Sequence, residues 1–326
     1  MNRARVLIAG CGQLGSRHLQ AVAALPEVDS IDVYDPRPEG LELGRERLAE
    51  VPDRTVADIR WLTSLDQASS SGDLCIVATR ADVRCNVVRE VVAKLRYPAF
   101  LIEKIVAQSA ADYGALLQFA ERSGLSVWVN CKARANVSHQ RIKSMLDPDR
   151  PIVFTAQGGN FGLANNGVHA ADLFAFFDSA DSIECVSSSV DPDLHASKRG
   201  SDVFDLTGTL MGKTRKGSQF LLSYSDHDSP DCFTIMAPNY RAIVDDMQRW
   251  FWESTRQSDW TWTRVPYEQN LAVSFMTRKF AADILGKGSC DLPTLRKCYP
   301  AHAFILNSLK PHFEKLLGQG ESCPVT

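Results

Sequence analysis

The stretch Arg5-Val-Leu-Ile-Ala-Gly10-Cys-Gly12-Gln-Leu-Gly15-Ser-Arg-His18 determines the fold expected of the first part of this chain. The short apolar run at 6–9 is typical of a buried parallel strand, and it leads directly into the spacing Gly-x-Gly-x-x-Gly and a helical pattern. Gly10 would make the tight turn, Gly12 would let the backbone approach a pyrophosphate, and Gly15 would let the helix pack on the strand. The free N–H groups of the helix N-terminus would hold that pyrophosphate. The pattern predicts a dinucleotide-binding turn, with a turn that binds no nucleotide as the alternative.

A second strand-like run, at 30–34, ends in Asp35, which lies twenty positions after Gly15. An acid at this place accepts hydrogen bonds from the adenosine ribose, and that favours NAD as the cofactor. Arg37 lies close by, and its guanidinium could hold a 2′-phosphate instead. The sequence therefore favours NAD and leaves NADP possible.

The composition indicates an ordinary globular protein of about two domains. The chain has 326 residues, 44% of them hydrophobic and 23% charged, with a net charge of −3. This charge gives no reason to expect nucleic acid or an anionic membrane as a partner, and no apolar run is long enough to span a bilayer. The first strand begins directly after the start Met, which leaves no room for a signal peptide. Nine scattered cysteines without a Cys-x-x-Cys pair favour reduced thiols and predict a cytoplasmic protein without a metal site.

Residues 1–130 are predicted to form a Rossmann domain, a doubly wound parallel sheet with helices on both faces. Ligands of such sheets gather at the carboxyl ends of the strands, and Thr79, Arg80, Glu103 and Lys104 fall at such ends. Further strands are expected at 60–61, 73–78, 100–102 and 126–129, and helices at 39–50, 86–95 and 112–123.

Residues 131–326 are predicted to form an α+β domain for substrate binding and oligomerisation, with a largely antiparallel open sheet. The last helix is expected to be interrupted at Pro300 and Pro311, and the C-terminal helices can pack back on the first domain. Helices are expected at 133–146, 167–177, 267–285 and 294–317, and strands at 152–157, 182–190, 203–211, 219–225, 232–237 and 240–244.

Three short motifs, in this order, resemble the Gfo/Idh/MocA family, which includes glucose–fructose oxidoreductase and inositol dehydrogenase. They are the opening glycine pattern, Glu103-Lys104 after a late strand, and His169-x-x-Asp172 at the head of a helix. The resemblance covers nearly the whole chain. It implies an NAD(P)-dependent oxidoreductase that acts on a CH–OH group.

The chain departs from the family pattern at three positions. Ile105 replaces the proline of Glu-Lys-Pro, and Arg80 replaces the proline that follows the family's threonine. Asn165 stands where the family has an aspartate four residues before the histidine. Asparagine can hold a hydroxyl, but it cannot increase the basicity of an imidazole as a carboxylate can.

The resemblance implies that Lys104 polarises the substrate hydroxyl, that His169 moves the proton, and that Asn165 orients the substrate. Imidazole suits proton transfer because its pKa lies near working pH. A surface lysine and a core histidine are the structural alternatives for Lys104 and His169. Substrate contacts are predicted for Arg134, Asn136 and Asp172, with Asn160 as a further polar candidate. Cofactor contacts are predicted for Gly10, Gly12, Gln13, Leu14, Gly15, Asp35, Arg37, Thr79, Arg80 and Glu103.

The predicted function is hydride transfer between a nicotinamide cofactor and a secondary hydroxyl of a sugar, polyol, or nucleotide- or amino-sugar derivative. The expected partners are this small-molecule substrate and further copies of the chain, in a homodimer or homotetramer. Two alternatives stay open. The lost aspartate and prolines are compatible with a non-catalytic, dinucleotide-responsive regulator or scaffold, and the fold also serves enzymes that use NAD transiently in elimination or epimerisation.

Overall fold

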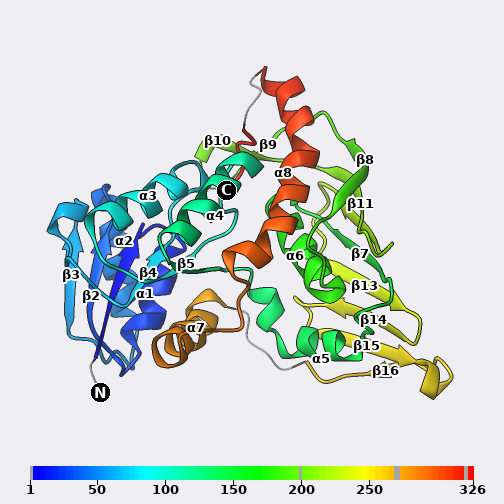
Figure 1. Ribbon diagram of the computed structural model, residues 1–326, viewed down its shortest axis with the longest axis horizontal. Helices are drawn as coiled ribbons and strands as arrows, with labels where there is room; N and C mark the ends of the chain where they lie inside the picture. Colours follow the sequence, from blue (N-terminus) through cyan, green and yellow to red (C-terminus); the bar gives the residue numbers. More distant parts are fainter. Residues whose placement is uncertain (1–2, 198–199, 268–271, 319–321) are drawn as a thin grey trace. The chain divides into compact units, whose positions relative to one another are not determined.

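The computed structural model describes residues 3–197, 200–267, 272–318 and 322–326, and the chain divides into two compact units (Figure 1). The first unit comprises Met1–Ala107, Asp112–Lys132 and Asn270–Arg296. The second unit comprises Gln108–Ala111, Ala133–Gln269 and Lys297–Thr326.

The described residues of the first unit contain a six-stranded parallel sheet with the strand order β3-β2-β1-β4-β5-β6. Strands β4 and β5 are apolar and buried along their whole length, because helices cover both faces of the sheet. The strand order reverses between β1 and β4, and this is the place where such sheets bind ligands. The strands are β1 (Ala4–Ala9), β2 (Val28–Tyr34), β3 (Asp58–Leu62), β4 (Leu74–Val77), β5 (Ala99–Ile102) and β6 (Ser126–Val129).

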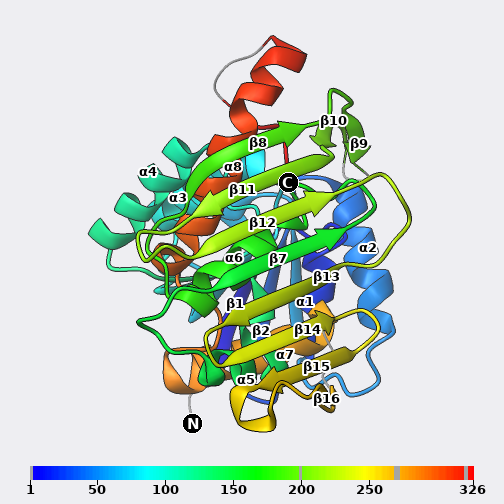
Figure 2. The ribbon, with the colours of Figure 1, turned by 90° about the vertical axis from the view of Figure 1, so that its right-hand side faces the viewer.

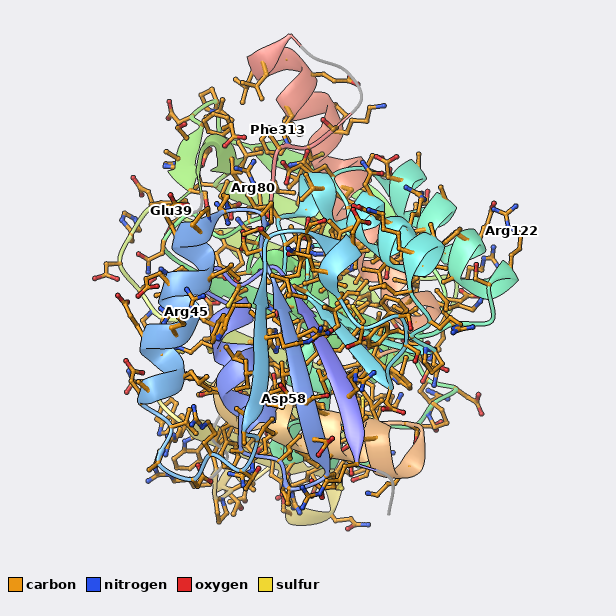
Figure 3. All side chains as sticks on the ribbon, turned by 90° about the vertical axis from the view of Figure 1, so that its left-hand side faces the viewer. Glu39, Arg45, Asp58, Arg80, Arg122 and Phe313 are labelled. Atoms are coloured by element: carbon orange, nitrogen blue, oxygen red, sulfur yellow. The ribbon has the colours of Figure 1, made fainter. Side chains whose placement is uncertain are left out.

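Helices flank this sheet on both sides, as the alternating pattern predicts. Helix α2, which carries Arg45, lies on one side, and α4, which ends at Arg122, lies on the other (Figure 3). Glu39 and Arg80 lie towards one end of the strands, and Asp58, which begins β3, lies towards the other end. Helix α7 packs against α1. The helices are α1 (Gly15–Ala23), α2 (Pro38–Ala49), η1 (Leu65–Gln67), α3 (Ala81–Lys94), α4 (Ala110–Arg122) and α7 (Val273–Lys287).

The glycine turn between β1 and α1 has the geometry that the sequence predicts. Gly10 has a φ of +90°, which L side chains rarely adopt, and a Cβ atom on it would lie 2.9 Å from Thr79 Cγ2. A Cβ atom on Gly15 would collide with the carbonyl oxygen of Gly10. Helix α1 can therefore start this close to β1 only because residue 15 has no side chain.

The second unit is built on an eight-stranded sheet of the order β16-β15-β14-β13-β7-β12-β11-β8 in the described residues (Figure 2). Strands β7 and β12 run parallel, and the other neighbouring strands are antiparallel. The strands are β7 (Val153–Gly158), β8 (Glu184–Val190), β11 (Gly208–Lys213), β12 (Gln219–Tyr224), β13 (Cys232–Ala237), β14 (Tyr240–Asp245), β15 (Trp250–Thr255) and β16 (Thr263–Arg264).

One face of this sheet is covered by helices, and the other faces the viewer in Figure 2. Phe154 and Phe220 on the sheet pack against Phe174 and Phe177 of α6, with ring centroids 5.0 to 6.1 Å apart. This arrangement confirms the prediction of a largely antiparallel open sheet in an α/β protein. The helical segments of this part are η2 (Lys132–Ala135), α5 (Val137–Met145), α6 (Gly167–Asp178), η3 (Arg256–Ser258) and α8 (Leu295–Leu317).

The structure corrects two boundaries expected for the second half. The strand expected at 203–211 is two strands, because the backbone turns at Gly208, whose φ is +125°. Its first part, β10 (Gly200–Asp205), pairs with β9 (His195–Ser197) in a separate small sheet. Residues 268–271 of the helix expected at 267–285 lie outside the described residues, and α7 begins at Val273.

Helix α8 also differs from its prediction, because it continues through Pro300 and Pro311. A proline inside a helix costs about 3 kcal/mol. Helix α8 buries Phe304, Leu309 and Phe313 almost completely, and each such side chain contributes roughly 1.5–3 kcal/mol. Tertiary packing therefore outweighs the local preference of the prolines.

All nine cysteines lie in the described residues, and none of them forms a disulfide. Among the helices that the structure describes, none combines the length and apolar character needed to cross a bilayer.

The close approach of α1 to the glycine turn predicts opposite effects of alanine at two helical glycines. Gly15→Ala should lower the free energy of unfolding by at least about 2 kcal/mol, because the new Cβ atom meets backbone. Gly286→Ala in α7 is the matched control, since its new Cβ atom would meet nothing within 4 Å, and it should raise stability by up to about 1 kcal/mol. Urea unfolding followed by circular dichroism measures both. Equal effects of the two substitutions would contradict the packing described here.

Candidate active site

The glycine turn has the features that a dinucleotide needs. Leu14, at the N-cap of α1, provides no side-chain cap for the first N–H groups of the helix. A Cβ atom on Gly12 would meet only the exposed end of the Arg37 side chain, with Nη2 3.9 Å away. Thr79 Oγ1, at the end of β4, is buried and has no hydrogen-bond partner among the described residues. The turn thus fits a pyrophosphate, and the orphaned hydroxyl fits a ligand beside it.

Arg47 of α2 holds the turn from outside. Its Nη1 donates to the carbonyl oxygen of Gln13 at 2.7 Å and to Ser16 Oγ at 2.7 Å. Ser16 Oγ in turn donates to the carbonyl oxygen of Gly12 at 2.8 Å. These bonds fix the carbonyl groups of the turn, so that its N–H groups keep one orientation.

Asp35 lies at the end of β2, as predicted, but its carboxylate faces inward. Oδ2 accepts the N–H of Cys11 at 2.9 Å, and Oδ1 accepts the N–H of Arg37 at 3.0 Å. The side chain of Asp35 is 3% exposed, whereas that of Arg37 is 69% exposed and places Nε 3.4 Å from Asp35 Oδ1. Burial raises the pKa of the Cys11 thiol to about 12, and the charge of Asp35 adds to this effect. At the end of β2, solvent therefore meets the guanidinium of Arg37 rather than the carboxylate of Asp35.

The ends of β4 and β5 are joined by Arg84, which the sequence analysis did not single out. Its guanidinium is buried and donates to the carbonyl oxygens of Thr79 and Ile105. The Lys104–Ile105 peptide bond is cis, although residue 105 is not a proline. Arg80, predicted to contact the cofactor, is paired with Asp82 at 3.3 Å.

Glu103 forms the centre of a buried network in the first unit. Its Oε1 accepts from His18 Nε2 at 2.8 Å and from Asn130 Nδ2 at 2.6 Å. His18 Nδ1 lies 2.9 Å from Thr277 Oγ1 in α7. Burial raises the pKa of Glu103, but the hydrogen bond and charge of His18 and the bond from Asn130 outweigh burial and lower it to about 2. Glu103 is thus an ionised, fixed group.

This network positions Lys104, the predicted catalytic lysine. The N–H of Lys104 lies 3.3 Å from Glu103 Oε2, and its side chain leaves the carboxyl end of β5 in a buried setting. The glycine turn and Lys104 both follow carboxyl ends of strands in the same parallel sheet. The predicted cofactor contact of Glu103 stays a prediction, since the bonds in the structure give this residue a positioning role.

His169 and Asn165 lie in the second unit, around the start of α6. His169 is in the first turn of the helix and is partly exposed, and Asn165 is in the preceding loop. Asp205 of β10 braces this loop, because it accepts the N–H groups of Ala164 at 2.8 Å and Asn165 at 3.1 Å. The Asn165 side chain also bonds to Asp205. Burial raises the pKa of Asp205 in spite of these bonds.

Asp205 therefore supplies, next to Asn165, a carboxylate in the region where the family pattern has an aspartate. Asp205 could not be singled out from the sequence, because it lies forty positions from Asn165 and belongs to no recognisable motif.

The three residues predicted to contact substrate have protein partners in the structure. Arg134 makes a bidentate pair with Asp172, with Nε to Oδ2 and Nη2 to Oδ1 both at 2.6 Å. Cys298 Sγ lies 3.3 Å from Asp172 Oδ1. Asn136 accepts the N–H of Ser138 at 2.9 Å and caps α5. The substrate contacts of these residues stay predictions.

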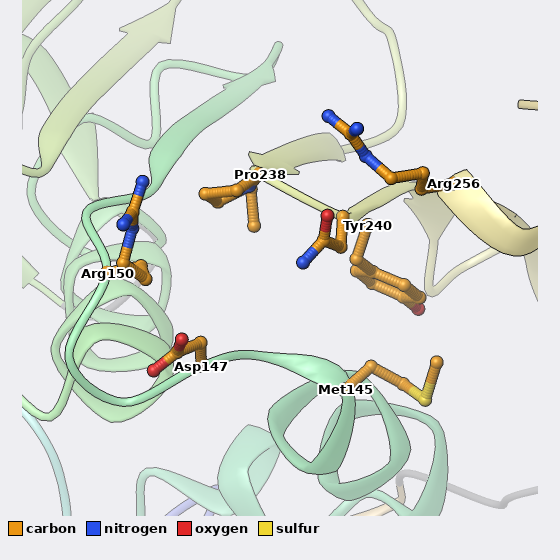
Figure 4. Close-up of a pocket in the computed structure, with 8 residues that line it drawn as sticks. Met145, Asp147, Arg150, Pro238, Tyr240 and Arg256 are labelled. Carbon is orange, nitrogen blue, oxygen red and sulfur yellow. The ribbon is translucent and has the colours of Figure 1, made fainter.

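Asn160 lies at the end of β7 in a left-handed conformation, with a φ of 58°, and its amide donates to Asp228 at 3.2 Å. A pocket of about 310 Å³ lies near the other end of β7, and Figure 4 shows its lining. Arg150, Asp147, Tyr240 and Arg256 contribute to this lining. The predicted site residues do not line it.

Comparison with known proteins supports the Rossmann assignment. Residues 4–131 match the model of the GFO_IDH_MocA family, described as an oxidoreductase family with an NAD-binding Rossmann fold. No curated protein matches the sequence significantly. Among solved structures, the UDP-N-acetylglucosamine 3-dehydrogenase GnnA from Acidithiobacillus ferrooxidans is similar, with a TM-score of 0.70, 18% identity, and coverage of 97% of this chain and 100% of that chain.

Two further structures are similar in the same way. The 3-ketoreductase KijD10 from Actinomadura kijaniata, in complex with NADP, has a TM-score of 0.70 and 16% identity, and covers 93% of this chain and 96% of its own. An oxidoreductase from Agrobacterium radiobacter, in complex with NAD⁺, L-tartaric acid and magnesium, has a TM-score of 0.72 and 13% identity, and covers 93% and 94%. At these identities the likeness shows the fold alone.

These findings confirm the resemblance to the Gfo/Idh/MocA oxidoreductases that the motifs predict. Residues 4–131 match the NAD-binding Rossmann domain of that family, and this match supports an NAD(P)-binding oxidoreductase. The prediction of a nicotinamide dinucleotide as cofactor is likewise confirmed.

The low pKa of Glu103 predicts a pH dependence of stability. The pKa falls from 4.5 to about 2 on folding, so the stabilisation is fully present above pH 4.5 and is lost as the pH falls towards 2. The advantage of the wild type over Glu103→Gln in unfolding free energy should shrink across this window by at most about 3 kcal/mol. Urea titrations at a series of pH values measure it. The exposed Glu27→Gln is the control and should track the wild type, while parallel curves for Glu103→Gln would disprove the network's role.

Proposed function

We propose that the protein is an NAD(P)-dependent oxidoreductase that interconverts a secondary hydroxyl and a carbonyl in a sugar, polyol, or nucleotide- or amino-sugar derivative. The observation that carries this proposal is the position of Lys104. A buried, ionised Glu103 fixes it at the carboxyl end of β5, on the sheet edge where the glycine turn also lies. A cation fixed beside a dinucleotide turn suits a substrate oxygen whose electron density increases or decreases during hydride transfer.

In the direction of oxidation, the substrate loses a hydride from carbon and a proton from oxygen. The bound nicotinamide supplies the hydride acceptor. Lys104 donates a hydrogen bond to the substrate oxygen, and His169 takes the hydroxyl proton. Asn165, braced by Asp205, orients the substrate. The chain's own groups thus bind, orient and move one proton.

The similar structures support a sugar-like substrate, since they include a UDP-N-acetylglucosamine 3-dehydrogenase and a 3-ketoreductase that was crystallised with TDP-benzene. Their identities of 17 to 18% leave the sugar open.

A substrate panel tests the proposal directly. The purified protein is incubated with NAD⁺ or NADP⁺ and a set of sugars, polyols and nucleotide sugars, and reduced nicotinamide is followed by its absorbance. We expect reduction of the cofactor with at least one class. Cofactor binding without turnover on any substrate would favour a regulator, and product formation without net reduced cofactor would favour elimination or epimerisation.

The proposed roles predict that Lys104→Ala and His169→Ala each lower kcat at least about 100-fold, because each removes a group that acts on the reacting oxygen or its proton. Cofactor affinity should stay nearly unchanged. The matched controls are Lys287→Ala and His227→Ala, whose side chains are 72% and 83% exposed. Steady-state kinetics and calorimetry measure the two effects. Unchanged kcat in both site variants would end this assignment.

We also propose that copies of the chain associate through the uncovered face of the large sheet. Val153 and Met236 are cross-strand neighbours on β7 and β13, with 44% and 53% of their surfaces exposed. Ile243 and Trp252 form a second apolar pair further along the sheet. Exposed apolar sheet faces of this kind are typical of subunit interfaces.

This association predicts a dimer or tetramer by light scattering coupled to size exclusion. The double variant Val153→Glu, Met236→Glu should be monomeric, because it buries two charges without partners. The control Val137→Glu places the charge on an exposed residue of α5 and should leave the mass unchanged. A monomeric wild type would contradict the proposal.

A further inference from the structure

The acid that predicts NAD from the sequence is not presented to a ligand in the structure. The carboxylate of Asp35 bonds the backbone N–H groups of Cys11 and Arg37 and is almost fully buried. Helix α2 also lies close over it, since a Cβ atom on Gly40 would be 2.6 Å from Asp35 Oδ2. A ribose hydroxyl can bond only to an oxygen that it can reach. Asp35 therefore braces the glycine turn in this conformation.

Arg37 presents its guanidinium in the place of that carboxylate. Its Nε lies 3.4 Å from Asp35 Oδ1, and its Nη2 would lie 3.9 Å from a Cβ atom on Gly12. The guanidinium therefore reaches from the end of β2 to the glycine turn. In a dinucleotide bound on such a turn, the adenosine ribose lies between these two points.

The surroundings of Arg37 also favour an anion. Arg37 is the N-cap of α2, with Pro38 following it, and no side chain caps the helix. The N-terminus of a twelve-residue helix carries a partial positive charge. Within the described parts of the chain, the carboxylate bonded to Arg37 is that of Asp35, and it accepts from Nε and the backbone N–H.

We propose that Arg37, anchored by Asp35, binds the 2′-phosphate of NADP(H), so that the protein prefers NADP(H) to NAD(H). This inference rests on the proposed oxidoreductase function. A guanidinium whose Nε is held by a carboxylate keeps its two Nη groups for a phosphate, and this fork matches phosphate oxygens. The preference is the reverse of the one that Asp35 alone predicts from the sequence.

Calorimetry with the full-length protein tests the inference through binding alone. NADP⁺ should bind at least about ten-fold more tightly than NAD⁺, as expected of one charge-assisted contact. Adenosine 2′,5′-bisphosphate and adenosine 5′-monophosphate differ only in the 2′-phosphate, and they should show the same order. Because the contact is ionic, the preference should become smaller at higher salt.

Arg37→Gln should weaken NADP⁺ binding about 10- to 100-fold and leave NAD⁺ binding within about three-fold. Arg122→Gln is the control, since it removes the same charge from the end of α4, on the other side of the sheet (Figure 3). It should change neither affinity. Circular dichroism and thermal unfolding confirm that both variants are folded.

The outcomes separate this inference from the proposed function. Equal affinities for the two cofactors, or tighter binding of NAD⁺, would overturn the role of Arg37 and leave the oxidoreductase proposal standing. Tighter binding of NAD⁺ by Arg37→Gln would also overturn it, because Arg37 would then be covering an acid that binds the ribose. No heat with either cofactor would refute both the inference and the proposed function.

Discussion

The contact between the start of α1 and the turn at Gly10 is the constraint on which the proposed chemistry depends. Because Gly15 has no Cβ atom, α1 begins directly against the backbone of that turn. This placement brings the helix N-terminus next to Gly12 and puts His18 in a fully buried position. There His18 bonds to the carboxylate of Glu103, and that carboxylate lies next to the backbone N–H of Lys104. One close approach of backbones thus positions both the glycine turn and Lys104, for which we propose a catalytic role.

The features that sequence alone could predict are local ones. The strand at 6–9, the glycine spacing and the alternation of strands and helices up to residue 130 depend on neighbours in sequence, and the structure confirms the resulting Rossmann fold. The open sheet of the second unit follows from its run of short strands without long helices between them. The end of β2 at Asp35 was also predictable, because the acid follows the apolar run immediately.

The features that sequence could not predict depend on distant partners. His18 and Thr277 are 259 positions apart, and Asp205 meets Ala164 across 41 positions. No local pattern marks such pairs. The inward orientation of Asp35 is a case of the same kind, since it depends on how closely α2 lies over it at Gly40. In α8 the prolines predicted a break, and burial of the helix's apolar face outweighed them.

Backbone amide exchange over residues 10–18 tests the central claim most directly, because it reports on the turn itself. With saturating NADP(H) or NAD(H), these amides should exchange more slowly, since their N–H groups would bond to the pyrophosphate. Amides of strands β14 and β15, which belong to the second unit, should be unaffected. Unchanged exchange at residues 10–18 with both cofactors would contradict the account.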